Sequence, residues 1–547
     1  MKSWAKNPAA IALALFFIGL FLVSIFYIDH RLIGDQLGLW GYISNHENQH
    51  PFALWNFNAA AGAPQSLNPE YSYLDASYFI SILVGDMATR SALINSFHLL
   101  LFGIGVLLLA YHITKRLDAS VIAASVATFS CGAAIRTIGN NPYYFGMAIM
   151  PFILYSLILL LEKPSYSRAF FVAFTWTYLI IAGGTGVFLW MIFFMPFFLL
   201  IYFFLYFDKA KIPRQAIFLI MAFVMFMLFS LFKIWGSFQY ASDTSLRPAV
   251  QPYQFFLQGN GLPPGFFNSL ASIVIRLPVS DYIGLWIGPL TLILLLFSLK
   301  SIKKKQYLLF FGMLVISVLV VFNTPITHLA HLVPFLNKTK DVVKSLFLFP
   351  MLTGIVAGFG FIELKDLLKK YSKTLSDYLP IILISLLIVQ FLAAFVFYSE
   401  GMLFDQGYKI NEKLRQESIL KDLQSNQPFR VSYEDFSGGL IQVRIAKQGY
   451  EVADWLHGNG FSMPFLTFKN IASQTRNYEM LGLMNVKYIY NTKPLNSTFL
   501  KLIRNNGQEF VFEDTAFLPR HIQVPHAILA YENGKNPTVA YSLMANP

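Results

Sequence analysis

Eleven apolar segments constrain this chain more than any other feature, because each is close to the length that a helix needs to cross a bilayer. Such a helix takes about 20 consecutive apolar residues, so the pattern predicts a polytopic α-helical membrane protein. The fifth segment is short and runs into Gly183–Gly186, where we expect the helix to break. The segments cover residues 8–28, 91–113, 119–135, 143–161, 169–182, 186–207, 216–236, 283–299, 307–323, 345–362 and 378–398.

The overall composition agrees with a membrane protein. The chain is 56% hydrophobic and only 13% charged, whereas soluble domains carry about 25% charged residues. The formal net charge is +12, but the basic residues are spread over many short loops instead of forming one patch. A nucleic-acid partner is therefore excluded, and membrane lipids are the expected surroundings.

The basic residues predict the orientation of the chain. Lysine and arginine concentrate in loops that stay in the cytoplasm, and five connections plus the N-terminus carry them, whereas residues 29–90 contain only Arg31 and Arg90. We expect a multi-pass protein of the cytoplasmic (inner) membrane with an uncleaved first helix and a cytoplasmic N-terminus. The inside positions are Lys2, Lys6, Lys115, Arg116, Lys163, Arg168, Lys209, Lys211, Arg214, Lys300, Lys303, Lys304, Lys305, Lys365, Lys369, Lys370 and Lys373.

The domain organisation follows from this orientation. Residues 1–398 form a transmembrane domain with outside loops at about 29–90 and 237–282, and residues 399–547 form an extracytoplasmic domain. Alternating apolar and polar residues in short runs favour strands, which predicts an α/β fold for this tail. The single Cys131 excludes a disulfide within the chain. The predicted strands cover residues 429–433, 440–445, 486–490, 510–512 and 521–524.

The long first outside loop carries acidic and aromatic residues that a simple anchor does not need. Asp35 follows Gly34 shortly after the first segment, where a carboxylate just above the bilayer is well placed as a general base. The alternative is a solvated loop aspartate or a helix N-cap. The other candidate substrate-binding residues of this loop are Trp55, Asn56, Glu70, Tyr71 and Asp75.

Five cations on the outer side form a second set of candidates, because outside loops disfavour them. Ionisable groups at a membrane boundary are often functional, and a departing phosphate needs positive charge to stabilise it. The alternative for each residue is snorkelling to ordinary lipid headgroups. These candidate substrate-binding residues are Arg136, Lys233, Lys338, Lys340 and Lys344.

The sequence does not indicate a cofactor. His46–His50 fits the H-E-x-x-H pattern of zinc proteases, but weak helix formers fill it and Pro51 follows at once, so we interpret the match as chance. A divalent metal remains possible without being indicated. No phosphate-binding or dinucleotide-binding motif is present.

Several motifs, taken in order, resemble those of YfhO-type bacterial membrane proteins. They comprise Gly34-Asp35-Gln36, Trp55-Asn56 with Gly62-Ala63-Pro64, Pro334–Lys338, Leu481–Ile489, and Glu513-Asp514 with Leu518-Pro519-Arg520. That family is similar to the GT-C superfamily of polytopic glycosyltransferases. The resemblance implies transfer of a sugar from a polyprenyl-phosphate carrier to an outside acceptor, with the first-loop acid role falling on Asp35. Lysines stand at 338, 340 and 344 where the family commonly has arginine.

Three functions remain open at this stage. The leading hypothesis is an inverting glycosyltransferase that uses a polyprenyl-phosphate sugar donor and an extracytoplasmic glycan, lipid or protein acceptor. The first alternative is a transporter or flippase of a lipid-linked substrate, for which the glycines at 183–186 would form an unwound helix. The second alternative is a non-catalytic scaffold for envelope assembly that binds partners through its tail.

Overall fold

A computed structural model describes the main part of the chain. The described residues are 7–29, 55–56, 63–64, 75–84, 87–130, 141–244, 287–321, 324–334, 336–338, 342–398, 419–423, 429–433, 450–452, 478–483 and 485–518.

A helix occupies every one of the eleven predicted apolar segments. The third segment continues from α5 into the wider turns of a π-helix, η3 (Val126–Ser130). The tenth segment begins with the tighter turns of a 3-10 helix, η6 (Val342–Leu348), before α16. The eleven helices are α1 (Pro8–Asp29), α4 (Met87–Thr114), α5 (Leu117–Ser125), α7 (Asn141–Glu162), α8 (Tyr166–Ile181), α9 (Thr185–Tyr206), α10 (Ile212–Thr244), α13 (Gly288–Ser298), α14 (Lys305–Leu319), α16 (Phe349–Lys369) and α17 (Lys373–Tyr398).

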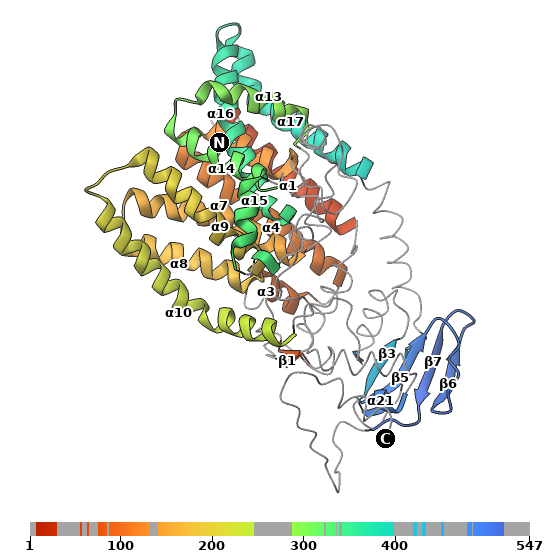
Figure 1. Cartoon of the computed structure of the whole chain (residues 1–547). Coiled ribbons are helices and arrows are strands. Elements are labelled where there is room, and N and C mark those ends of the chain that lie inside the picture. Colours follow the sequence, from red (N-terminus) through yellow and green to blue (C-terminus); the bar gives the residue numbers. More distant parts are fainter. Residues whose placement is uncertain are drawn as a thin grey trace.

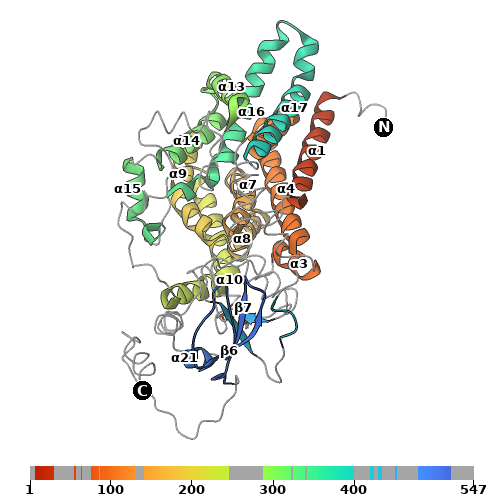
Figure 2. The same ribbon diagram turned by 90° about the vertical axis from the view of Figure 1, so that its right-hand side faces the viewer.

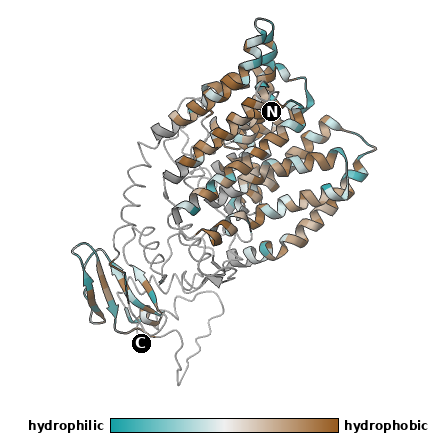
Figure 3. Cartoon of the chain, turned by 180° about the vertical axis from the view of Figure 1, so that it is seen from behind, coloured by the Kyte–Doolittle hydropathy of each residue, from teal (hydrophilic) through white to brown (hydrophobic). Residues whose placement is uncertain are grey.

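Five of these helices are long and apolar enough to cross a membrane. Their spanning segments are Pro8–Ile25, Ala92–Thr114, Gly186–Tyr206, Ile212–Ser237 and Lys373–Ala393. The other six helices stay predictions as membrane spans. The hydropathy colouring in Figure 3 shows that the helix bodies are brown and that their connecting loops are teal.

Several of the basic loops lie together at one end of the helical bundle. Lys365 near the end of α16 donates to Asp118 at the start of α5, with 2.7 Å between Nζ and Oδ2. Arg116 contacts the same carboxylate at 3.1 Å. Lys304 pairs with Glu363 at 2.9 Å. The chain therefore gathers three of the predicted inside connections at one end, although the side of the membrane to which this end belongs stays a prediction.

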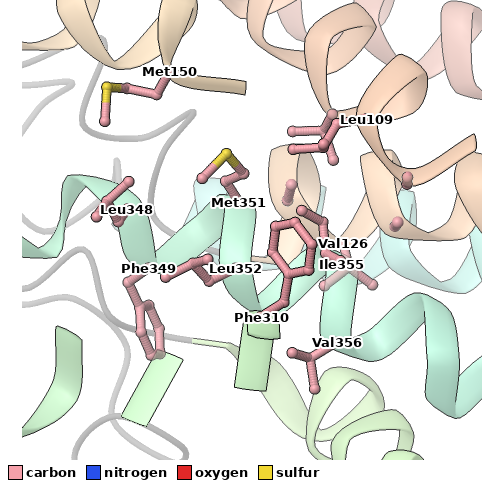
Figure 4. Close-up of a cluster of buried hydrophobic side chains, with 14 of the residues drawn as sticks. Leu109, Val126, Met150, Phe310, Leu348, Phe349, Met351, Leu352, Ile355 and Val356 are labelled. Atoms are coloured by element: carbon pink, nitrogen blue, oxygen red, sulfur yellow. The ribbon is translucent and has the colours of Figure 1, made fainter. Parts of the chain in front are cut away.

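The core of the bundle lies around α16, which packs against α4, α5, α13 and α14. Leu109, Met150, Phe310 and Ile355 come from four different helices, and each is at most 1% exposed. Figure 4 shows these side chains gathered around α16. The backbone of α16 comes unusually close to its neighbours, because a Cβ atom on Gly360 would overlap the carbonyl oxygen of Leu294 in α13.

A five-stranded mixed sheet forms the described part of the tail. The order is β4-β3-β5-β7-β6, in which β3 is parallel to both β4 and β5, whereas β5, β7 and β6 are antiparallel neighbours. Figures 1 and 2 show that this sheet lies beyond the end of the bundle at which α10 finishes. Its elements are β3 (Arg430–Tyr433), β4 (Glu451–Val452), α21 (Tyr478–Leu483), β5 (Val486–Asn491), β6 (Leu500–Asn505) and β7 (Phe510–Asp514).

Both faces of the sheet are covered by apolar side chains. Val431, Tyr488 and Val511 pack on one face with Leu420, and the opposite cluster joins Ile489 to residues of α21 and to partly buried side chains between β5 and β6. Three predicted strands are present as β3, β5 and β7, whereas β4 and β6 were missed. The predicted strands at 440–445 and 521–524 lie outside the described residues, and the division of the chain at residue 398 stays a prediction.

Candidate functional site

The segment predicted to be the first outside loop contains a short helix, α3 (Ala76–Leu83), that begins at a buried acid. Asp75 is the N-cap of this helix, and its Oδ1 accepts a hydrogen bond of 2.9 Å from the backbone N–H of Tyr78. Such a cap satisfies one of the amides that a helix start leaves open. The sequence predicts Asp75 as a substrate-binding acid, and its role as a helix cap was not predicted.

An amphipathic pattern fixes how α3 lies on the bundle. Ser77 and Tyr78 are at most 1% exposed, whereas Phe79 and Leu83 are 46% and 80% exposed. At the other end of the helix, the Nε of Arg90 donates to the carbonyl oxygen of Val84, 2.6 Å away. The guanidinium thus binds a carbonyl at the end of α3, where a cation is favourable.

The acid at the start of α3 meets a buried cation from α10. Asp75 is 2% exposed and Lys233 is fully buried, and the two side chains interact electrostatically. Burial raises the pKa of the Asp75 carboxyl, while hydrogen bonds from Tyr78 and Ser77 act in the opposite direction. Two residues predicted separately from the sequence are therefore neighbours in the fold.

A tyrosine from α8 completes this buried cluster. Tyr178 lies near Asp75 and close to the backbone of Ala76. Among the residues that the structure describes, neither its hydroxyl oxygen nor the Oδ2 of Asp75 has a hydrogen-bond partner. Because an unpaired buried polar group costs about 1–3 kcal/mol, these two atoms of electrostatically interacting residues suit a site that a polar ligand completes.

Two glycines form the connection between α8, which carries Tyr178 near its end, and α9. The helix ends at Ile181, Gly183 has a φ of 79°, and α9 begins at Thr185, so the predicted break is confirmed. Gly184 packs directly on Gly146 of α7, since a Cβ on Gly184 would lie 3.0 Å from the Cα of Gly146. The glycines form a turn between two helices and not an unwound segment inside one.

A buried histidine in α4 contacts the first turn of α3. His98 is 1% exposed, its Nδ1 lies 2.8 Å from the carbonyl oxygen of Ile94, and its Nε2 lies 3.4 Å from the Oγ of Ser77. The sequence interpretation missed Ser77, His98 and Tyr178. Polar residues within or next to apolar spans are often functional, and this signal could have identified the three residues. The local sequence pattern, however, does not show that they lie near Asp75.

The other predicted site residues are placed only in part. Trp55 and Asn56 form β1, which pairs antiparallel with β2 (Ala63–Pro64). This register joins two pieces of the family-like motif. The backbones of Lys338 and Lys344 lie in η5 (Leu336–Lys338) and η6, while their side chains are outside the described part. Asp35, Glu70, Tyr71, Arg136 and Lys340 also lie outside the described residues.

Metal ligands do not gather among the residues that the structure describes. No group of three or more His, Cys, Asp or Glu side chains in those ranges has a geometry that would hold a metal ion. The H-E-x-x-H segment at 46–50 lies outside them.

Comparison with known proteins identifies the class of fold. No protein-family model and no curated protein sequence matches this chain. Among solved structures, the chain is similar to the arabinofuranosyltransferase AftD from Mycobacteria, with a TM-score of 0.55 and 10% identity over 92% of this chain and 40% of that one. A second, mutant structure of AftD gives the same TM-score of 0.55 with 12% identity, over 93% and 42% of the two chains.

The chain thus shares its fold with AftD and spans about two fifths of the length of that protein. It is also similar to ArnT from Cupriavidus metallidurans, whose structure is bound to undecaprenyl phosphate. That comparison has a TM-score of 0.49 and 13% identity, over 93% of this chain and 99% of the other.

Proposed function

We propose that this protein is a membrane glycosyltransferase that moves a sugar from a polyprenyl-phosphate-linked donor to an extracytoplasmic acceptor. The acceptor is a cell-envelope glycan, a lipid or a protein. The observation that carries the proposal is the buried carboxylate of Asp75, which interacts electrostatically with the buried Lys233 in a fold shared with an arabinofuranosyltransferase.

In this mechanism a first-loop aspartate is the general base. It takes the proton of the acceptor hydroxyl as the oxygen attacks the anomeric carbon, and the bond between that carbon and the phosphate oxygen breaks. The phosphate departs with the electron pair, and because the acceptor oxygen attacks from the opposite face, the configuration of the anomeric carbon is inverted. Asp35 and Asp75 are the two candidates for this base, and Asp75 is the one for which burial raises the pKa and so strengthens the carboxylate as a base.

The phosphate that departs needs positive charge at the outer boundary. Lys233 is fully buried next to Asp75, and a cation in a low-dielectric site stabilises a developing anion more than it does in water. In the proposal Arg136, Lys338, Lys340 and Lys344 approach the same phosphate from the outside loops.

The proposal is tested with membrane vesicles and radiolabelled polyprenyl-phosphate sugars. Wild type is compared with Asp35→Asn, Asp75→Asn and, as a control, Asp208→Asn, because Asp208 is an exposed acid paired with Lys211 in a connection predicted to lie inside. Removing the base should lower transfer by about 10²–10⁴-fold, whereas Asp208→Asn should transfer like wild type.

Each other outcome decides between the alternatives. Full transfer in both first-loop variants would remove the acid from the mechanism. If wild type transfers no sugar from any donor while labelled lipid crosses the bilayer, the protein is a flippase. If neither transfer nor crossing occurs, the scaffold remains.

A further inference from the structure

Apolar packing brings the last turn of α8 to the start of α3. Tyr178 of α8 and Ile80 of α3 pack against the same buried pair, Ile94 of α4 and Ala182. The Tyr178 hydroxyl lies close to the backbone of Ala76, which is the first residue of α3. The side chain of Tyr178 is therefore positioned by its apolar neighbours, at the end of α3 that Asp75 caps.

Helix α10 brings a positive charge to the same acid. Ile234 of α10 packs against the buried cluster that contains Ile180 of α8, and the preceding residue, Lys233, interacts electrostatically with Asp75. A nearby cation favours the ionised form of a carboxyl group, and the proposed role of Asp75 as a base requires that form. The oxygens of a carboxylate only accept hydrogen bonds.

Asp75 and Tyr178 each keep one hydrogen-bonding capacity unused within the described ranges. The Oδ1 of Asp75 accepts from the backbone N–H of Tyr78 at 2.9 Å, whereas Oδ2 is buried without a partner in those ranges. The Tyr178 hydroxyl is also buried and also lacks a partner there. A phenol can donate its proton. Two residues that interact with each other thus offer an acceptor and a donor.

We propose that Asp75 and Tyr178 together bind the hydroxyl group of the acceptor, which donates to Oδ2 of Asp75 and accepts from the phenol of Tyr178. This inference rests on the proposed function and deepens it, because it adds Tyr178 as a residue that holds the acceptor. Tyr178 keeps its proton throughout, and the bonds that form and break remain those of the proposed transfer.

A hydroxyl oxygen can serve both residues and still react. It carries one proton and two lone pairs. The proton is donated to Asp75, one lone pair accepts from Tyr178, and the second lone pair attacks the anomeric carbon. Contacts with two residues orient that second lone pair, and correct orientation of the reacting atoms is a large part of enzymatic rate enhancement.

This arrangement restricts the acceptor to the class of alcohols, such as the hydroxyls of a glycan, of a lipid headgroup or of a serine or threonine side chain. An amide or ammonium nitrogen only donates, so as the attacking atom it would leave the phenol of Tyr178 unpaired. A phosphate oxygen is negatively charged, and the Asp75 carboxylate would repel it. Because an unpaired buried polar group is unfavourable, the two residues select against both classes.

The first test compares Tyr178→Phe with wild type in the vesicle transfer assay over a range of donor concentrations. Phenylalanine keeps the ring and removes only the hydroxyl. We expect transfer to fall by about tenfold, because one hydrogen bond to the attacking oxygen is lost. The KM for the labelled donor should stay within about twofold of wild type, because the donor does not contact the phenol.

Thr177→Val is the matched control for this substitution. Thr177 immediately precedes Tyr178 in α8, and its hydroxyl too is buried without a partner in the described part of the chain. Valine has nearly the same shape and lacks the hydroxyl. This variant should transfer like wild type, so that a loss in Tyr178→Phe alone identifies the phenol as the group that holds the acceptor.

The outcomes separate this inference from the proposed function. A wild type that transfers no sugar refutes the proposed function. If wild type does transfer, an equal rate in Tyr178→Phe overturns the inference alone. A raised donor KM in Tyr178→Phe overturns it as well, because the phenol would then bind the donor. Equal losses in Tyr178→Phe and Thr177→Val would also contradict it.

The second test needs no sugar donor and measures thermal unfolding of the detergent-solubilised protein. If the Tyr178 hydroxyl serves a ligand, Tyr178→Phe should unfold at or above the wild-type temperature. Tyr307→Phe is the control, because the hydroxyl of this fully buried tyrosine lies 3.3 Å from Oγ of Ser298. That variant loses an existing hydrogen bond and should unfold at a lower temperature. A melting temperature of Tyr178→Phe as low as that of Tyr307→Phe would show a partner for the hydroxyl within the protein and would refute the inference.

Discussion

Lys365 and Asp118 form a 2.7 Å ion pair although 247 residues separate them in the sequence. The pair joins the start of α5 to the end of α16, and Arg116 contacts the same carboxylate. Their side chains are only 18% and 11% exposed, so water screens the pair weakly. One acid thus holds together two connections that the charge pattern had assigned to the same side of the membrane.

Replacing this acid should loosen the basic end of the bundle. Asp118→Asn leaves Lys365 without its carboxylate and leaves Arg116 only the longer contact of 3.7 Å with Asp366, and we expect the detergent-solubilised protein to lose about 1–3 kcal/mol of unfolding free energy. Thermal unfolding followed by circular dichroism measures the loss. Asp208→Asn serves as the control, because the side chains of Asp208 and Lys211 are 42% and 60% exposed and such pairs contribute little. Equal melting temperatures for the two variants would contradict the prediction.

The pairing of Asp75 with Lys233 should appear in a double-mutant cycle. Each single variant, Asp75→Asn or Lys233→Met, removes one of two buried groups that interact electrostatically, so each should destabilise the protein. The double variant removes both charges, so its loss of stability should be clearly smaller than the sum of the two single losses. Strict additivity would show that the two side chains do not interact.

The close contact between α13 and α16 should make Gly360 intolerant of any side chain. A Cβ at this position would overlap the carbonyl oxygen of Leu294, and backbone cannot move aside as a flexible side chain can. We expect Gly360→Ala to destabilise the bundle by at least about 1–3 kcal/mol. In Gly312→Ala the new methyl group meets only the end of Ile201, at 3.2 Å, so that variant should unfold close to wild type. The measurement is thermal unfolding of both variants in the same detergent.

A buried acid in the tail should make the stability of the sheet depend on pH. Burial raises the pKa of the Asp514 carboxyl to about 7, the backbone N–H of Ala516 lowers it, and the charge of Glu479 raises it further. The unfolded chain loses this proton near its ordinary pKa of about 4, so the folded sheet binds more protons between these two values. Its stability therefore falls as pH rises from about 4 to about 7, by at most about 1.4 kcal/mol for each pH unit.

Limited proteolysis of the full chain at pH 5 and pH 8 measures this effect. The tail of wild type should be cut faster at pH 8, and Asp514→Asn should remove most of the difference. A wild-type tail that resists cleavage equally at both values would show that Asp514 does not titrate in this range.

The positions of the helices could be predicted from the sequence because long apolar runs carry their own signal. Even the break before α9 was predictable, since Gly183 and Gly184 supply a turn that other residues adopt only with strain. The strand β6 was missed because its sequence, Leu500–Asn505, is half polar and its outer side chains face solvent. Its pairing with β7 decides its structure, and that pairing is not local.

The candidate site was predictable only as separate residues. Asp75 and Lys233 each stood out as a charge near a membrane boundary, but their contact depends on how α3 and α10 pack. Ser77 and His98 looked like ordinary polar residues next to or inside apolar runs. The capping of α3 by Asp75 illustrates the difficulty, because one carboxylate both begins a helix and meets a distant lysine.

The parallel pairing of β3 with β5 sets the order in which the tail can assemble. During synthesis β3 leaves the ribosome well before β5, and no hairpin can bring two parallel strands together. The antiparallel strands β5, β6 and β7 are close in sequence and can pair as soon as they emerge. The newly made chain must therefore keep the exposed edge of β3 unpaired until its C-terminal part has arrived, and in that interval β3 is the segment on which a chaperone would act.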